Sequence, residues 1–444
     1  MLGGVVFGCG GFRVLGEDLC GVIVRTLGGR VDRMTVLGES EGLCNVVCEG
    51  FDGVFLVGKG VVFEEGLLDA LSSSEGDVLA AVDGSVDAGS LPRVGGDGLV
   101  FVGVMYVGGE ALEWLCRHCR DFGDVDSVLE ALSGVFRVRL VGVEGFAWWR
   151  VRDERGALAA SWRLKLARER ERLRDKRVFL FDLDGTLVLG RKPIGGAGEF
   201  LDFLKRSELK PVVVTNNSSL TRDDVLVRIR DTLGVMLEED EVYSSVEFFA
   251  SRFGSSGKFY YLLPRRVVEY YGLEHCWDDP EECDGVAVGF DRELTYGRLA
   301  DASLLLQRGK RFLLIHPDLR YPSEEGFLPD AGSIARLLEA VTGRSPEWVG
   351  GKPSGEFIGH YLSSRGYSES ESVYFGDRLY TDVKMGLESG IDVVLVLTGE
   401  TGISDIDEGF LLKDHVFVAR DLVEYALLVY GVRLGRVDYR GLGL

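Results

Sequence analysis

Residues 178–186 read Val178-Phe-Leu-Phe-Asp-Leu-Asp-Gly-Thr186, four apolar residues followed directly by two carboxylates with one residue between them. A short apolar run of this kind is typical of a buried strand in a parallel sheet. Both carboxylates point into the same crevice at the strand end, and Gly185 lets the backbone turn and present amide groups to a phosphate. The stretch therefore predicts a ligand site at the carboxyl end of a strand.

The chain after residue 176 repeats this alternation of short apolar runs and helix-patterned segments. Parallel strands need helical crossovers that cover both faces of their sheet, so the pattern predicts a doubly wound, Rossmann-like α/β core. The further runs are Val212–Val214, Phe259–Leu263, Val286–Val288, Phe312–Ile315, Val373–Phe375 and Val393–Leu397.

Three more polar motifs follow such runs or lie between them. Thr215-Asn-Asn217 offers a hydroxyl and amides to phosphate oxygens, Gly350-Gly-Lys-Pro-Ser354 holds a lysine at a turn, and Gly376-Asp-Arg-Leu-Tyr-Thr-Asp382 adds two carboxylates. Taken singly, each is an ordinary loop, turn or helix cap. Their joint occurrence indicates one phosphate-binding site.

The charges of these motifs indicate a metal ion. The carboxylates of Asp182, Asp184, Asp377 and Asp382 balance with Lys352 and an incoming phosphate only if a divalent cation is present. Oxygen ligands of this kind suit Mg²⁺, which keeps several waters and completes its shell with substrate phosphate. We expect Asp182 to attack phosphorus in line, with Lys352 and the cation neutralising the phosphoryl group.

In this order, the motifs resemble those of the haloacid dehalogenase superfamily of phosphohydrolases, over roughly residues 177–430. The long insertion between Thr215 and Lys352 resembles the branch with an α/β cap of the C2 type, which includes the p-nitrophenyl phosphatase, phosphoglycolate phosphatase and NagD-like enzymes. The resemblance implies a Mg²⁺-dependent phosphatase that hydrolyses a small phosphomonoester through an aspartyl-phosphate. Phosphosugars, phosphoglycolate and polyol phosphates are the implied substrate classes.

The resemblance also implies a role for each motif residue. Asp182 would be the nucleophile, and Asp184 the general acid and base. The Mg²⁺ ion would be held by Asp182, the backbone carbonyl of Asp184, and Asp377, with Asp382 in support. The residues that would contact the phosphoryl group are Gly185, Thr215, Asn216 and Lys352.

The insertion, residues 243–330, is expected to fold as the cap, and residues 177–242 and 331–444 as the hydrolase core. Within the cap, His316 and Asp318 stand where relatives tend to have Asn-x-Asp, so both are candidate substrate contacts. A structural histidine with satisfied hydrogen bonds is an equal alternative for His316.

Residues 1–150 also alternate apolar runs and helical segments, which predicts a separate α/β domain. The segments Gly8–Arg13 and Gly53–Lys59 resemble a degenerate sugar-phosphate nucleotidyltransferase, with Lys59 where an acidic metal ligand is expected. A nucleotidyltransferase activity that makes the enzyme bifunctional, a non-catalytic or regulatory domain, and a binding or oligomerisation module all stay open. Residues 151–176 are predicted to form a basic helical connector exposed to solvent.

Four of the eight cysteines come as two close pairs. Cys44 with Cys48, and Cys116 with Cys119, have the paired spacing of a Cys₄ zinc site. Disulfides or a redox dithiol are alternatives. We favour buried structural thiols for these four cysteines.

Charge and composition limit the function classes. The 444 residues include 71 acidic and 50 basic side chains, and a net charge of −21 disfavours nucleic acid and anionic membranes as partners. No apolar run approaches the ~18–20 residues of a membrane span, and the first residues lack secretory features. We expect a cytoplasmic protein, with a homo-oligomer open. One glutamine and three asparagines are typical of a thermophile or of a GC-rich genome.

Overall fold

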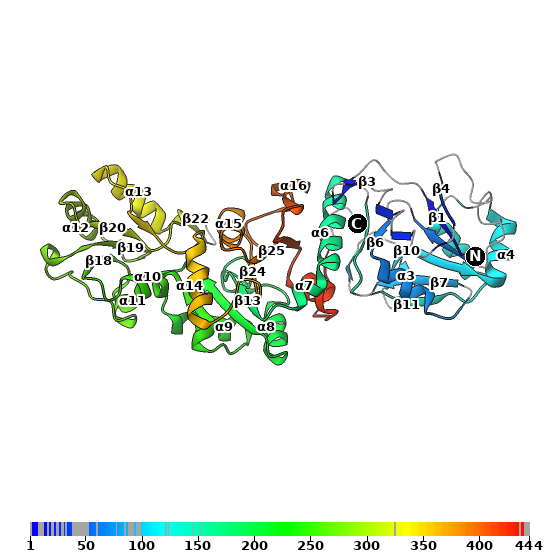
Figure 1. The fold of residues 1–444 in the computed structure, drawn as a ribbon, viewed down its shortest axis with the longest axis horizontal. Helices are drawn as coiled ribbons and strands as arrows, with labels where there is room; N and C mark the ends of the chain where they lie inside the picture. The colour runs from blue at the N-terminus through cyan, green and yellow to red at the C-terminus, as the bar shows by residue number, and fades with distance from the viewer. Residues whose placement is uncertain are drawn as a thin grey trace. The chain divides into compact units, whose positions relative to one another are not determined.

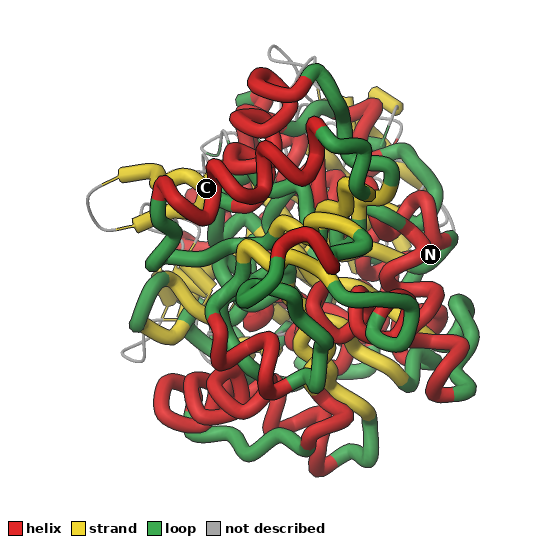
Figure 2. Tube along the Cα trace, turned by 90° about the vertical axis from the view of Figure 1, so that its left-hand side faces the viewer, coloured by secondary structure: helices red, strands yellow, loops and turns green. Residues whose placement is uncertain are grey.

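The computed structural model describes residues 153–323, 326–434 and 437–438, and residues 2–151 with gaps. Its contacts divide the chain into two compact units, Met1–Arg174 with Ile403–Leu444, and Asp175–Gly402. Both units contain helices and strands (Figure 1). Figure 2 draws the helices in red and the strands in yellow. In the described parts of the chain, no helix has the length and apolar character that a bilayer crossing requires.

The second unit contains a parallel sheet with the strand order β17-β16-β13-β24-β25. These strands run over Val242–Ser244, Lys210–Thr215, Val178–Phe181, Ser372–Gly376 and Asp392–Val396. The accompanying helices are α8 (Ala197–Arg206), α9 (Arg222–Leu233), α14 (Gly355–Arg365) and α15 (Lys384–Ser389) (Figure 1). Every residue of β13 is buried, as a central strand requires. The predicted α/β fold class is confirmed.

The register of β13 determines where a site forms. Phe181, its last residue, lies opposite Phe375 of β24, and β16 on the other side ends at Thr215. Asp182 and Asp377 each directly follow the last residue of their strand. Because the strands are parallel, all three polar residues leave the sheet at the same edge.

A second parallel sheet in this unit, with the order β18-β19-β20-β23, forms the inserted cap. Its strands run over Phe259–Leu262, Gly285–Val288, Arg311–Leu314 and Trp348–Val349. Its helices are α10 (Ser245–Phe253), α11 (Arg265–Tyr270), α12 (Tyr296–Gln307) and α13 (Ala331–Thr342). Ala335 and Leu338 of α13 pack in the core of the cap. The packing of the cap thus continues beyond residue 330, where the predicted boundary stood.

Cys276 and Cys283 of the cap form a disulfide, with their Cα atoms 5.5 Å apart. No pairing was predicted for these two cysteines. A spacing of seven residues carries no motif, and their pairing depends on a tertiary approach that sequence does not reveal. Cys44 and Cys48 lie outside the described residues. Cys119 is disulfide-bonded, so the Cys₄ zinc alternative and the preference for a thiol at Cys119 are both wrong.

The first unit contains a mixed sheet with the order β11-β7-β10-β5-β1-β4. These strands run over Arg139–Gly142, Val78–Asp83, Leu99–Gly108, Gly53–Val57, Leu2–Phe7 and Arg33–Leu37. Strand β10 runs antiparallel to both of its neighbours in this order. Residues 8–12 and Lys59, on which the nucleotidyltransferase resemblance depends, lie outside the described residues, and that resemblance remains a prediction.

Helix α6 (Glu154–Arg168) packs within the first unit against the segment that follows residue 403. The carboxylate of Glu424 accepts hydrogen bonds from Arg163 Nη1 at 2.7 Å and Trp162 Nε1 at 3.1 Å. Glu424 is completely buried, and the exposed fractions of Trp162 and Arg163 are 0% and 1%. The expected solvent exposure of the connector is therefore wrong for α6, because this face binds a buried carboxylate.

Replacing Glu424 by alanine is expected to lower the free energy of unfolding by about 3–5 kcal/mol, because the Arg163 guanidinium stays buried without its partner. Glu171→Ala is the matched control, since the Glu171 side chain is 81% exposed beside Arg174. It should change stability by less than about 0.5 kcal/mol. Urea denaturation measures both, and equally small effects would contradict the buried ion pair.

A buried histidine joins the cap to the loop that follows β16. His316 Nε2 lies 3.0 Å from Ser218 Oγ, which also accepts a hydrogen bond from the backbone N–H of Phe290 at 2.8 Å. The carboxylates of Asp318 and Asp330 lie 3.6 Å from Nδ1 and 3.7 Å from Nε2. Burial lowers the pKa of His316, but these carboxylates raise it more, and the net pKa lies above 6.5.

Because this pKa is higher in the folded than in the unfolded state, His316 stabilises the protein fully below pH 6.5. The contribution is lost as the pH rises through the folded-state pKa. Wild type should therefore lose stability relative to His316→Gln over this range, as measured by chemical denaturation at successive pH values. Parallel curves for the two proteins would contradict a charged His316.

Candidate active site

The ends of β13 and β24 bring three aspartates together around one lysine. Asp182, Asp377 and Asp382 are buried, and each presents an oxygen within 4.8 Å of the others. Lys352 Nζ donates hydrogen bonds to Asp182 Oδ1 at 2.5 Å and to Asp382 Oδ1 at 2.9 Å. The hydroxyl of Tyr374 accepts from Lys352 Nζ at 3.1 Å and donates to Asp382 Oδ1 at 3.0 Å. Four predicted site residues thus lie in one place.

Two glycines allow the backbone to approach Asp377 this closely. Gly185 has a φ of +101°, and a Cβ atom there would collide with the Asp377 carboxylate. A Cβ atom at Gly399 would collide with the same group. The backbone N–H of Glu400 then donates to Asp377 Oδ2 at 2.6 Å. These contacts fix one oxygen of Asp377 and leave Oδ1 buried without a hydrogen-bond partner.

Burial and mutual repulsion disturb the ionisation of this group. Burial raises the pKa of Asp182 to about 6, with Lys352 opposing the rise and Asp382 adding to it. Burial, with the charges of Asp182 and Asp382, raises the pKa of Asp377 to about 8. Burial alone would lower the pKa of Lys352, but Asp182 and Asp382 raise it well above its ordinary value. Lys352 therefore carries its charge, and the carboxylates favour an added positive charge.

These residues fit a divalent cation. When all three carboxylates are ionised, they exceed the Lys352 ammonium by two negative charges, which is costly in the protein interior without a counter-ion. The raised pKa values of Asp182 and Asp377 reflect this cost. Oδ1 of Asp377, which has no hydrogen-bond partner among the described residues, is available as a ligand for such a cation. All of the donor atoms are carboxylate oxygens, the chemistry that Mg²⁺ prefers.

The two residues at the end of β16 differ in what their side chains can bind. Thr215 Oγ1 accepts from the backbone N–H of Asn217 at 3.0 Å, so its hydroxyl proton can be donated to a phosphoryl oxygen. Asn216 Oδ1 accepts from the backbone N–H of Lys352 at 2.8 Å, and Nδ2 donates to the carbonyl oxygen of Lys352 at 3.0 Å. The Asn216 amide, which was predicted to bind the phosphoryl group, thus holds the turn that carries Lys352.

The two cap candidates reach the site through Asn216. Asp318 Oδ2 accepts from Asn216 Nδ2 at 3.1 Å, and His316 lies behind this contact with Asp330. Burial raises the pKa of Asp318, but His316 lowers it more, and the net pKa is low. Asp318 is therefore an ionised carboxylate that links the cap to the loop after β16.

Asp184 does not belong to the group of three carboxylates. Its side chain is 35% exposed, and its carboxylate is bound by Arg228 of α9. Sequence reasoning placed both carboxylates of the first motif in one crevice, and it did not single out Arg228. No local pattern marks an arginine that meets Asp184 from 44 residues away.

Sequence analysis also missed Tyr374, Arg378 and Glu400. Arg378 Nε lies 3.1 Å from Glu400 Oε2, and burial lowers the pKa of Arg378 less than the nearby aspartates raise it. The position of Arg378 directly after Asp377 was an available signal. Tyr374 looked like one more apolar strand residue.

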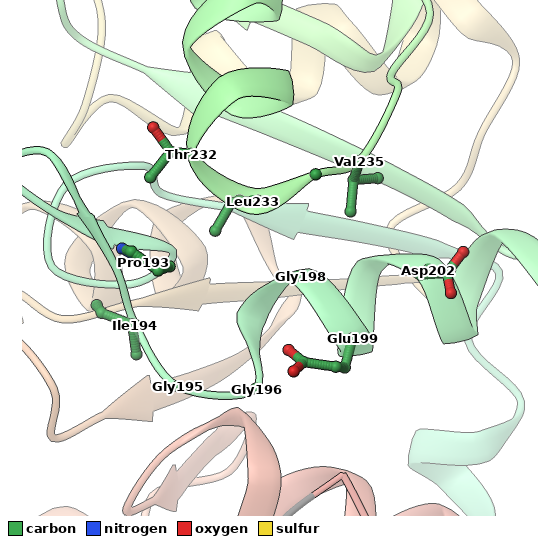
Figure 3. Close-up of a pocket in the computed structure, with 11 residues that line it drawn as sticks. Pro193, Ile194, Gly195, Gly196, Gly198, Glu199, Asp202, Thr232, Leu233 and Val235 are labelled. Atoms are coloured by element: carbon green, nitrogen blue, oxygen red, sulfur yellow. The ribbon is translucent and has the colours of Figure 1, made fainter.

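A hollow of about 500 Å³ lies elsewhere in the second unit (Figure 3). Residues near β15 (Lys192–Pro193), the start of α8 and the end of α9 line it, including Glu199 and Asp202. None of these described lining residues is basic. The hollow is therefore unsuited to a phosphate, and the aspartate group remains the candidate site.

Comparisons with known proteins identify the family of this chain. A model of the haloacid dehalogenase-like hydrolases matches residues 179–271, and a HAD-hydrolase-like model matches residues 349–425. The acid sugar phosphatase of Staphylococcus haemolyticus is 33% identical over 236 residues, which cover 52% of this chain and 88% of that protein.

Solved structures of phosphatases are also similar to this chain. The 4-nitrophenylphosphatase of Thermotoga maritima is 38% identical with a TM-score of 0.53, covering 58% of this chain and 99% of that one. A p-nitrophenyl phosphatase from Archaeoglobus fulgidus is 29% identical with a TM-score of 0.52, and the match covers 58% of this chain and 100% of that one. A glycerol phosphate phosphatase from Mycobacterium tuberculosis, solved with magnesium, is 25% identical with a TM-score of 0.50, covering 57% and 77%. The chain belongs to the haloacid dehalogenase-like hydrolases, as a NagD-like phosphatase that hydrolyses phosphoric monoesters.

Proposed function

We propose that this phosphatase is Mg²⁺-dependent and hydrolyses a small phosphomonoester through an aspartyl-phosphate on Asp182. The observation that carries the proposal is the buried group of Asp182, Asp377, Asp382 and Lys352, whose excess negative charge and oxygen donors suit one divalent cation. The similar glycerol phosphate phosphatase solved with magnesium supports the choice of metal.

In the first half-reaction, a carboxylate oxygen of Asp182 attacks phosphorus. The bond from phosphorus to the ester oxygen breaks, and that oxygen keeps the electron pair and takes a proton from the carboxyl group of Asp184. Lys352 binds Oδ1 of Asp182 and thereby orients the other oxygen for attack. The hydroxyl of Thr215 binds a phosphoryl oxygen. The backbone N–H of Gly185, which was predicted to bind phosphate, instead donates to the carbonyl oxygen of Val188 at 2.8 Å.

In the second half-reaction, the carboxylate of Asp184 takes a proton from a water molecule whose oxygen attacks phosphorus. The bond from phosphorus to Asp182 breaks, and inorganic phosphate leaves. Asp182, Asp377 and the backbone carbonyl of Asp184 would hold the Mg²⁺ ion, with Asp382 in support. When bound, the ion supplies positive charge that neutralises the phosphoryl oxygens.

We further propose that the substrate is a phosphosugar, phosphoglycolate or a polyol phosphate. The similar proteins named as acid sugar phosphatase and glycerol phosphate phosphatase support the phosphosugar and polyol phosphate classes. A panel of such phosphomonoesters, assayed for phosphate release, distinguishes among them.

Wild type with Mg²⁺ should release p-nitrophenolate from p-nitrophenyl phosphate, and chelation with EDTA should abolish this activity. Asp182→Asn should lower kcat by about a thousandfold or more, because the nucleophile is lost. Asp202→Asn is the matched control, since the Asp202 side chain is 51% exposed and pairs with Arg206. Equal rates for wild type and Asp182→Asn, or full activity in EDTA, would contradict the proposal.

A further inference from the structure

Arg228 binds the carboxylate of Asp184 with both arms of its guanidinium. Nη2 donates to Oδ1 at 2.6 Å, and Nη1 donates to Oδ2 at 3.4 Å. The same Nη2 also donates to the carbonyl oxygen of Gly190 at 2.8 Å. A planar fork that meets both carboxylate oxygens fixes the orientation of the group as well as its position.

The segment that carries Asp184 is itself a tight turn. Asp184 forms a bridge with Val188, and the backbone N–H of Gly185 donates to the carbonyl oxygen of Val188 at 2.8 Å. Gly190, with a φ of +63°, then connects β14 (Val188–Leu189) to β15. Arg228 therefore holds both ends of this turn, Asp184 at its start and Gly190 at its tip.

Helix α9 gives Arg228 a fixed base. The helix begins at a capping box, in which Thr221 and Asp224 each bind the backbone of the other. Val225 and Ile229, on either side of Arg228 in sequence, are buried with exposed fractions of 1% and 0%. The Arg228 side chain, at 24% exposed, extends from this anchored helix to Asp184.

We propose that Arg228 is a positioning residue for general acid–base catalysis by Asp184, an inference that rests on the proposed function. Both oxygens of Asp184 accept from Arg228, and we assign the proton transfer to Oδ2 because its contact, at 3.4 Å, is the longer and weaker one. Oδ2 gives its proton to the leaving ester oxygen in the first half-reaction and takes one from water in the second. In this role Arg228 acts on the substrate only through Asp184.

Two substrates separate this role from a structural one. The p-nitrophenolate ion leaves without a proton, whereas an alkoxide needs one, and kcat/KM reports the steps up to the departure of the leaving group. Arg228→Ala should lower kcat/KM for the alkyl phosphate that wild type hydrolyses best by about tenfold or more beyond its effect on p-nitrophenyl phosphate. Asp184→Asn should show the same bias. The double variant should be no slower than Asp184→Asn.

Arg230→Ala is the matched control, because Arg230 lies on the same helix, is 50% exposed and pairs with Asp231. It should behave as wild type towards both substrates. Arg228→Lys should recover part of the alkyl phosphatase activity. If circular dichroism shows that Arg228→Ala is unfolded, Arg228→Lys and Arg228→Gln take its place in the comparison. Equal losses on both substrates, or losses that add to those of Asp184→Asn, would overturn the role of Arg228. A wild type inactive on every phosphomonoester would instead contradict the proposed function.

Discussion

The ammonium group of Lys352 lies 2.5 Å from Asp182 and 2.9 Å from Asp382, with an exposed side-chain fraction of 6%. Three carboxylates this close repel one another in an interior of low dielectric constant, and each would otherwise be driven to protonate. Lys352 offsets one of the three charges and keeps the nucleophile oriented. The negative charge that remains when all three carboxylates are ionised makes the group suited to a divalent cation.

Asn216 holds the turn that carries this ammonium group. Asn216 binds both the N–H and the carbonyl oxygen of Lys352, and its amide also contacts Asp318 of the cap. The cap, the loop after β16 and the lysine turn thus meet at one buried side chain. A change in the cap at Asp318 therefore reaches the nucleophile Asp182 through two residues.

The sequence predicted the parts of the fold that depend on local patterns. Short apolar runs located β13, β16 and β24, and Asp182, Thr215 and Asp377 leave the sheet at one edge because the strands are parallel. The partners of those carboxylates were not predictable in this way. Arg228 and Glu400 come from other segments of the chain. Tyr374 lies within an apolar strand sequence, so nothing in the pattern marked it as a polar site residue. The boundary at residue 330 failed for a similar reason, because α13 belongs to the cap by packing and not by composition.

The most direct test of the account is the chemical identity of the intermediate on Asp182. Enzyme mixed with substrate and Mg²⁺ is quenched during turnover and reduced with borohydride, which converts an aspartyl-phosphate into homoserine. Peptide mapping by mass spectrometry then identifies the modified position. We expect homoserine at position 182 in samples that contained substrate, and aspartate there in samples without it. Unmodified Asp182 together with reduction at another carboxylate would contradict it.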